Sequence, residues 1–358
     1  MKLKYALIGC GRIAPNHIQA ALENDLQIVA LCDLETSKAE DLIKRHKLNS
    51  DVKIYSKYQD MIKEHNIDLI AIATESGNHS SIAIDCIKNR INLIIEKPIS
   101  LSIEDADKII TSAKEYNVKV SACHQNRFNK SIKKIREAVE MNRFGKLFYG
   151  TAHIRWNRGK NYYLQAPWRG TWKQDGGALM NQCIHNIDLL RWMMGDDIDE
   201  VFAYTDNLNH DFIETEDMGL ALIKFKNGSY GIIEGTTTIY PKNLEETLYI
   251  FGENGTVKAG GKSVNIIEEW MFNDEIDNSS QVKQVYHENP PNVYGFGHKP
   301  LYRNTIESIL NNVEPYVSAV DGRNALELVL AIYKSAAEGK PVKLPLLKGS
   351  TTDFLGRF

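Results

Sequence analysis

The stretch KYALIGCGRIA, residues 4–14, runs from a short apolar segment directly into a glycine-rich turn. A turn of this spacing, placed between a strand and the start of a helix, is typical of a dinucleotide site. Gly9 allows the tight turn, Gly11 lets the backbone approach a pyrophosphate, and Ala14 permits close packing of the helix. An ordinary glycine-rich turn is the alternative. The residues expected at the dinucleotide are Gly9, Gly11, Arg12 and Ile13.

An acidic residue, Asp33, ends the next apolar run about twenty residues later. A carboxylate in this position can accept hydrogen bonds from the adenosine ribose, which favours NAD as the cofactor. It would repel the 2′-phosphate of NADP, and only Lys38 nearby offers a cation. The alternative role for Asp33 is to cap the next helix.

Residues 1–124 alternate short apolar runs with helical patterns. Runs that are apolar throughout, rather than alternating, are expected when helices cover both faces of a sheet. The order predicts an α/β fold with a doubly wound parallel sheet, a Rossmann domain spanning residues 1–124. The expected strands are Tyr5–Gly9, Gln27–Cys32, Asp68–Ala73, Asn92–Glu96 and Val118–Cys123.

The pattern changes after residue 124, which predicts a second domain over residues 125–358. Alternating runs and two Asn-Gly pairs indicate an α+β domain with a large, open, mostly antiparallel sheet, because both Asn and Gly tolerate the positive φ of tight hairpins. A polar exposed loop is expected over residues 275–291. The other expected elements are helices Ser131–Asn142, Lys299–Asn311 and Arg323–Glu338, strands Met218–Phe225 and Tyr230–Thr238, and turns at Asn227-Gly228 and Asn254-Gly255.

Composition excludes several classes of protein. At 358 residues with 43% hydrophobic content, the chain is long enough for two cores. A net charge of −3 with intermixed signs argues against nucleic acid as a partner. The N-terminus has neither a signal-peptide core nor a membrane span, so a cytoplasmic location without membrane attachment is expected. Five scattered cysteines without a CxxC pair predict reduced, buried thiols, and we expect no metal.

A lysine stands at the carboxyl end of a buried strand in Ile94-Ile95-Glu96-Lys97-Pro98. Ligands of open α/β sheets bind at this edge. The Lys97 ammonium could donate to a substrate hydroxyl or carbonyl, and a nearby cationic nicotinamide would lower its pKa toward the acid/base range. A plain surface charge at the strand end is the alternative.

A helix is predicted from Asp175-Gly176-Gly177 to Met194, with Gly195 as its stop signal. One stripe of this helix carries Asn181, His185, Asp188 and Trp192, and a neighbouring, mostly apolar stripe should face the core. His185 would then present its imidazole beside Asn181, a pair suited to handling the proton of an alcohol. A structural histidine is the alternative. The neighbouring stripe comprises Met180, Ile184, Ile187, Arg191 and Met194.

The glycine turn at residues 9–14, the Glu96-Lys97-Pro98 segment and the segment from Asp175 to His185 together resemble the Gfo/Idh/MocA oxidoreductase family. The resemblance extends over nearly the whole chain. The resemblance implies a Rossmann domain for the cofactor, an open sheet that often forms the oligomer face, and a substrate contact by Lys97. The family commonly has an aspartate where this chain has Asn181, and an amide cannot act as a base. The remaining cofactor contacts that the resemblance implies are Thr74, Ser76, Asn78, His79, Glu96, Lys97 and Gln125.

Longer segments resemble one subgroup, the UDP-N-acetylglucosaminuronate 3-dehydrogenases of bacterial surface-polysaccharide (O-antigen) synthesis. These segments are residues 125–127, 158–172 and 177–182. Fixed cations suit an anionic nucleotide sugar, and aromatic rings could stack on sugar or uracil. Solvated arginines and core aromatics are the alternatives. The expected substrate contacts are Lys97, Arg127, Arg158, Tyr163, Trp168, Arg169, Asn181 and His185.

The subgroup resemblance implies a reaction. Lys97 and His185 would polarise and deprotonate the carbon 3 hydroxyl, Asn181 would orient it, and oxidation would give a 3-keto sugar. Some members of the subgroup reoxidise their cofactor with 2-oxoglutarate, and family analogy implies a homodimer or homotetramer. Two alternatives remain open: a dehydrogenase of a free sugar or polyol such as inositol or glucose, and a non-catalytic dinucleotide-binding regulator.

Overall fold

The computed structural model describes residues 2–290 and 292–358, which form two compact units. The first unit contains Met1–His124 together with His298–Arg323, and the second contains Gln125–Gly297 together with Asn324–Phe358. We expected residues 298–323 in the second domain; the structure places them in the first. No helix among the described residues is long and apolar enough to span a membrane.

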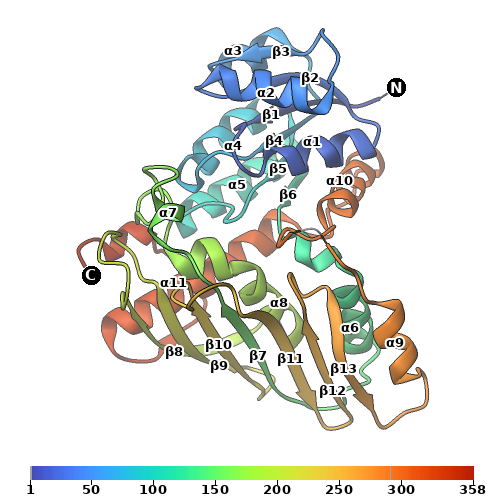
Figure 1. Cartoon of the computed structure of the whole chain (residues 1–358), viewed down its shortest axis with the longest axis vertical. Helices are drawn as coiled ribbons and strands as arrows, with labels where there is room; N and C mark the ends of the chain where they lie inside the picture. Colours follow the sequence, from blue (N-terminus) through green and yellow to red (C-terminus); the bar gives the residue numbers. More distant parts are fainter. Residues whose placement is uncertain (1, 291) are drawn as a thin grey trace. The chain divides into compact units, whose positions relative to one another are not determined.

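The sheet of the first unit has the strand order β3-β2-β1-β4-β5-β6, and every pair in it is parallel (Figure 1). This confirms the predicted doubly wound sheet. The strand β3 was not predicted, because three residues with one lysine carry no readable apolar run. The strands are β1 Lys4–Ile8, β2 Gln27–Cys32, β3 Lys53–Tyr55, β4 Leu69–Ile72, β5 Asn92–Ile95 and β6 Val120–Ala122.

The helices of this unit cover the sheet with apolar stripes. In α5 the buried residues Ile103, Ala106, Ile109 and Ala113 recur at helical spacing, and the Ser102 side chain accepts a hydrogen bond from the third residue of the helix. The helix α10 packs against α1 although almost three hundred residues separate them (Figure 1). The helices are α1 Ala14–Glu23, α2 Thr36–His46, α3 Tyr58–Glu64, η1 Ser76–Asn78, α4 His79–Lys88, α5 Ile103–Tyr116 and α10 His298–Asn311.

The second unit is built on an eight-stranded sheet of order β13-β12-β11-β7-β10-β9-β8-β14. Only β7 and β10 run parallel; the other described neighbours are antiparallel, as predicted. The strands are β7 Leu147–Arg155, β8 Ile198–Asp206, β9 Met218–Phe225, β10 Tyr230–Thr236, β11 Glu245–Gly252, β12 Gly255–Gly260, β13 Ile266–Phe272 and β14 Val342–Lys343.

Both predicted hairpins are present, but of the four Asn and Gly residues only Gly228 has the expected positive φ. Gly228, between β9 and β10, has a φ of +87°, and Asn227 accepts a hydrogen bond from the Ser229 amide. The second pair joins β11 to β12, yet neither Asn254 nor Gly255 has a positive φ. Gly255 is already part of the strand, so the turn that we expected there lies earlier.

One face of this sheet is covered and the other is open. The helix α8, Ile184–Met194, packs against β7, β10 and β11 (Figure 1). Along β9 buried and exposed residues alternate, so one set of side chains points to the covered face of the sheet and the other to the open face. The open face carries large exposed apolar side chains, namely Tyr204, Leu220, Leu222, Tyr230 and Ile232.

The predicted loop over residues 275–291 contains a helix, α9, Ser279–Val285, which packs against β13. The Asn278 side chain caps it by accepting from the Gln281 amide, and Val282 is its buried anchor. The prediction of a loop was wrong because the segment is mostly polar, and the short helix has Val282 as its buried apolar residue. The other elements of the second unit are η2 Gln125–Phe128, α6 Lys130–Glu140, α7 Lys160–Tyr163, η3 Leu179–Cys183 and η4 Thr351–Phe354, while α11, Ala319–Glu338, begins in the first unit and continues in the second.

Candidate functional site

The glycine-rich turn has the geometry of a pyrophosphate site. Gly9 has a φ of +94°, and a Cβ there would lie 2.5 Å from the carbonyl of Ala73, so no other residue fits. At Gly11 an added Cβ would meet nothing within 4 Å, which leaves room for a ligand. The first turn of α1 has no acidic residue and no side-chain cap. An uncapped helix N-terminus of this kind attracts anions, so these residues fit the dinucleotide.

Asp33 is held against this turn by two backbone amides. Its carboxylate oxygens accept from the Cys10 amide at 2.8 Å and from the Glu35 amide at 2.9 Å. Lys38 pairs with Glu35 at 2.9 Å, and that hydrogen bond is the main reason why the pKa of Lys38 is raised. The carboxylate is therefore fixed beside the glycine turn, the arrangement that ribose recognition by an NAD site requires.

The loop of residues 74–79, which carries four of the expected cofactor contacts, is connected to the Lys97 segment by a buried histidine. His79 places Nδ1 2.7 Å from the Pro98 carbonyl and Nε2 3.1 Å from the Thr74 carbonyl. Burial lowers the pKa of His79. Asn78 donates to the Glu75 carboxylate, and Ser76 is buried at the start of η1. His79 thus connects the start of this loop to the segment that follows Lys97.

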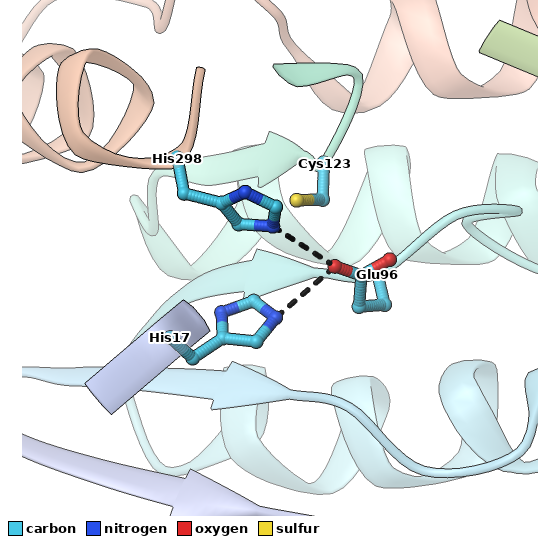
Figure 2. A group of neighbouring side chains, drawn as sticks. All are labelled: His17, Glu96, Cys123 and His298. Carbon is cyan, nitrogen blue, oxygen red and sulfur yellow. Dashed lines mark hydrogen bonds and ion pairs between the residues drawn. The ribbon is translucent and has the colours of Figure 1, made fainter. Parts of the chain in front are cut away.

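Lys97 lies at the carboxyl end of β5, where its side chain is partly exposed. The preceding Glu96 is buried and its Oε2 accepts from the Lys97 amide at 3.1 Å. The Lys97-Pro98 peptide bond is cis. Glu96 also takes part in a cluster with His17, Cys123 and His298 (Figure 2). Sequence reasoning gave none of these three a catalytic, cofactor or metal role, although the segment that begins at Gly297 resembles a family segment near the substrate.

In the second unit, Asn181 lies in η3, a π-helical turn that precedes α8. Its amide Nδ2 donates to Asp175, and its Oδ1 accepts from Gln182 Nε2. The π-turn inserts an extra residue, so Asn181 does not share one regular helical stripe with the residues of α8 up to Trp192. His185 is half-buried in the first turn of α8, just after the π-turn.

Two residues of the expected stripe, Asp188 and Trp192, contact Arg127. Its guanidinium, in a side chain with 1% exposure, donates to both Asp188 oxygens at 2.7 and 2.6 Å and lies 4.6 Å from the ring centroid of Trp192. Arg127 is therefore a buried, bidentate ion-pair partner. We expected it to contact substrate; the structure places it in the core behind α8.

The remaining predicted substrate residues gather around Tyr162. Its hydroxyl receives hydrogen bonds from Arg169 and from Gln182, and Gln182 in turn accepts from Arg158 Nε at 2.8 Å. The Arg169 guanidinium lies 4.5 Å from the Trp168 ring centroid. All of these side chains are partly exposed. We call this set, with Asn181 and Asp175, the Tyr162 network.

The expected substrate contacts included Tyr163 and not Tyr162. Tyr163 is buried and packs against His210 and Phe212, with its hydroxyl 3.3 Å from the Thr237 hydroxyl. Nothing in the local sequence separates the two tyrosines. Their roles are set by which side of α7 meets the sheet.

The buried acid Glu216 accepts a hydrogen bond from the first residue of the π-turn. Glu216 Oε1 accepts from the Leu179 amide at 2.7 Å and from the Tyr333 hydroxyl at 2.8 Å. Gly177 has a φ of +101°, and a Cβ there would lie 2.1 Å from Glu216 Oε2. Complete burial raises the pKa of Glu216 to about 8. The acid therefore ties the start of the π-turn, and with it Asn181, to α11.

Two family models match the chain. Residues 3–124 match the oxidoreductase family's NAD-binding Rossmann fold, and residues 136–344 match the oxidoreductase family's C-terminal alpha/beta domain. The first matched segment contains the whole parallel sheet, and the second contains most of the second unit together with residues 298–323 of the first.

Solved structures with the same fold include two WlbA dehydrogenases in complex with NADH and UDP-GlcNAcA. The one from Bordetella pertussis is 35% identical, with a TM-score of 0.88 over 96% of this chain and 98% of that chain. The one from Chromobacterium violaceum is 33% identical, with a TM-score of 0.88 over 96% of each chain. The myo-inositol 2-dehydrogenase of Thermotoga maritima is 26% identical over 96% of this chain and 98% of its own length.

Proposed function

The chain belongs to the Gfo/Idh/MocA family of NAD-dependent oxidoreductases, and from that premise we propose that it oxidises the carbon 3 hydroxyl of UDP-N-acetylglucosaminuronate to a 3-keto sugar nucleotide. The observation that carries the proposal is the Tyr162 network. It holds two partly exposed guanidiniums, those of Arg158 and Arg169, against aromatic rings. Such groups suit a carboxylate or a diphosphate. A free polyol would need neither cation.

The proposed chemistry uses three side chains of this chain. Bound NAD supplies the hydride acceptor. Lys97 donates a hydrogen bond to the substrate hydroxyl oxygen, and His185 accepts the hydroxyl proton. Asn181 orients the hydroxyl. Together these groups remove the hydroxyl proton and stabilise the alkoxide that develops as it leaves.

Asn181 is suited to orientation because its amide is held at both ends. Asp175 accepts from its Nδ2, and Gln182 donates to its Oδ1, so the amide cannot flip without breaking both bonds. Asp175 also accepts from the Gly170 amide at 2.7 Å, which fixes the carboxylate itself. An amide has no basic lone pair for a proton, so proton acceptance falls to His185.

We also propose that the protein self-associates through the open face of the eight-stranded sheet. This face exposes Leu222 at 58% and Tyr230 at 56%, beside Tyr204 and Ile232. Leu222, Tyr230 and Ile232 line a groove on this face whose surface is largely apolar, with Lys146, Glu200 and Lys224 as its charged residues. A second copy of the same sheet offers matching apolar side chains in a two-fold arrangement.

A polyol such as myo-inositol is the second candidate substrate, because the inositol dehydrogenase relative covers nearly the whole chain. The two candidates differ in charge. A polyol enzyme would gain nothing from UDP or from a carboxylate on the sugar. The identity to that relative is lower than the identity to the WlbA dehydrogenases, which favours the nucleotide sugar.

The test is mass spectrometry of the purified protein incubated with NAD, 2-oxoglutarate and UDP-N-acetylglucosaminuronate. We expect loss of two hydrogens from the sugar nucleotide, with 2-oxoglutarate as the proposed reoxidant increasing the yield. UDP-N-acetylglucosamine, which lacks the carboxylate, is the matched control and should react far more slowly. Oxidation of myo-inositol in place of the sugar nucleotide would overturn the proposal. Absence of any product, with NAD bound, would point to a regulator.

A further inference from the structure

We propose that the first unit contains a binding site for a zinc-class divalent cation, formed by His17, Glu96, Cys123 and His298. These four residues, here the buried tetrad, come from α1, the end of β5, the end of β6 and the start of α10. Their candidate ligand atoms all lie within 4.8 Å of one another, and all four side chains are buried (Figure 2). The site is separate from the groups assigned to hydride transfer, and the inference does not depend on the substrate proposed above.

The spacing of the tetrad suits a tetrahedral metal ion. A zinc ion with its ordinary bond lengths separates two nitrogen or oxygen ligands by roughly 3.3 Å, and somewhat more when sulfur is involved. Glu96 Oε1 lies 3.0 Å from His17 Nε2 and 3.7 Å from His298 Nε2. Figure 2 shows both imidazoles converging on this carboxylate oxygen with the Cys123 sulfur beside them. Small side-chain shifts are enough to admit an ion.

Hydrogen bonding within the tetrad does not account for the Nε2 atom of His298. His298 Nε2 forms no hydrogen bond with any described residue, although the residue is only 5% exposed, and its contact with Glu96 is at ion-pair distance. At 3.7 Å it is too far from Glu96 to donate a normal hydrogen bond. Buried polar atoms of this kind call for an explanation. A cation that the nitrogen ligates would provide it.

The donor set selects the class of cation. Two imidazole nitrogens, one thiolate and one carboxylate oxygen are typical zinc ligands. Calcium and magnesium prefer oxygen ligands in larger number, and the tetrad offers a single carboxylate. The thiolate and carboxylate together balance the charge of a divalent ion in a buried site.

The surroundings orient the ligands as outer-shell groups do at metal sites. His17 Nδ1 lies 2.7 Å from the Tyr302 hydroxyl, which lies 2.8 Å from the Tyr5 hydroxyl. A hydrogen bond on Nδ1 leaves Nε2 directed at the tetrad and fixes the ring. A bound ion would connect α1, both strand ends and α10, and would hold Glu96 directly before Lys97.

The experiment is metal analysis of the full-length protein, purified after expression with zinc and dialysed against metal-free buffer. We expect about one zinc ion per chain. Cys123→Ser should weaken zinc binding by at least about tenfold, whereas Cys86→Ala, a buried cysteine of the same unit outside the tetrad, should keep the ion. A wild-type protein without zinc that also fails to take up added zinc would overturn the proposal.

Cobalt substitution tests the ligands without relying on a variant that folds. The cobalt-loaded wild type should show a thiolate-to-metal charge-transfer band and the intense d–d bands of tetrahedral cobalt. Cys86→Ala should retain both sets of bands, and Cys123→Ser should lose the charge-transfer band alone. A spectrum without thiolate ligation, or one that Cys86→Ala abolishes, would show that the cation binds elsewhere. Neither measurement requires the enzyme to turn over a sugar.

Discussion

The Arg127 guanidinium donates two hydrogen bonds to the Asp188 carboxylate, at 2.7 and 2.6 Å, inside the core of the second unit. Removing one partner leaves the other charge buried and unpaired, which typically costs about 3–5 kcal/mol. We therefore expect Asp188→Ala to lower the free energy of unfolding by roughly that amount in urea titrations. Glu140→Ala breaks the exposed Arg136–Glu140 pair and should cost under about 1 kcal/mol. Equal losses in both variants would contradict a special role for the buried pair.

Lys97→Ala should reduce turnover by about a hundredfold or more, because the variant lacks the proposed donor to the substrate hydroxyl. The variant should still retain NAD, because the glycine turn and Asp33 remain in place to hold the cofactor. Product formation can be followed by mass spectrometry, and NAD binding by the cofactor retained after gel filtration. Lys88→Ala, in an exposed lysine at the end of α4, is the matched control. Full turnover in Lys97→Ala would remove this residue from the mechanism.

The bond between Asn181 and Asp175 can be tested by an exchange of the two side chains. Asn181→Asp places a second carboxylate beside Asp175, and their repulsion should lower both stability and kcat. The double variant Asn181→Asp/Asp175→Asn restores an amide–carboxylate pair and should recover stability to within about 1 kcal/mol of wild type. Additive losses, measured by urea unfolding, would show that the pair does not interact as described.

Glu216 gives stability a defined pH dependence. Burial raises its pKa to about 8 in the folded state, against an ordinary value of 4.5 for a glutamate exposed to water. Between these two values the folded state holds a proton that the unfolded state has lost, so stability falls as pH rises and levels off above about 8. The limiting slope for one such group is roughly 1.4 kcal/mol per pH unit.

Glu216→Gln should remove that contribution, because an amide keeps the acceptor oxygen for Leu179 and has no proton to lose. The unfolding free energy of the wild type minus that of the variant, measured from pH 5 to 8, should therefore decrease as pH rises. Glu246, whose pKa burial also raises to about 8, contributes with the same sign and remains in both proteins. A pH-independent difference would mean that Glu216 is ionised when folded.

The open sheet face predicts a change of oligomeric state. Leu222→Glu places a charge in the middle of the exposed apolar side chains and should convert the assembly to monomer in light-scattering measurements. Leu244→Glu, at an exposed leucine outside the strands, should leave it unchanged. A wild-type protein that is already monomeric would exclude self-association through this face.

Much of the architecture could be predicted from the sequence because long apolar or alternating runs carry it. The strands Gln27–Cys32 and Met218–Phe225 begin and end as predicted. The three-residue strand Lys53–Tyr55 and the capped helix Ser279–Val285 have no such run, and both escaped prediction. Short elements depend on contacts made by distant parts of the chain, which a local pattern does not contain.

The candidate site was less predictable for two physical reasons. The π-turn Leu179–Cys183 shifts Asn181 relative to the residues of α8, so Asn181 leaves the expected stripe. Asp188, on the regular helix, pairs with Arg127 in the core, a contact that no local pattern contains. The buried tetrad draws residues from four separate elements, and none of its spacings matches a metal-binding motif. Only the folded chain brings them together.

The chain passes between its two units three times, because His298–Arg323 returns to the unit that Met1–His124 began. During synthesis the first unit must therefore wait for this late segment to leave the ribosome. Until then, Tyr5 and His17 have no Tyr302 to bind, and α1 has no α10 to pack against. A fragment cut after residue 124 would contain every strand of the Rossmann sheet and still lack part of its core, so excising this domain or swapping it into another protein has to carry both segments.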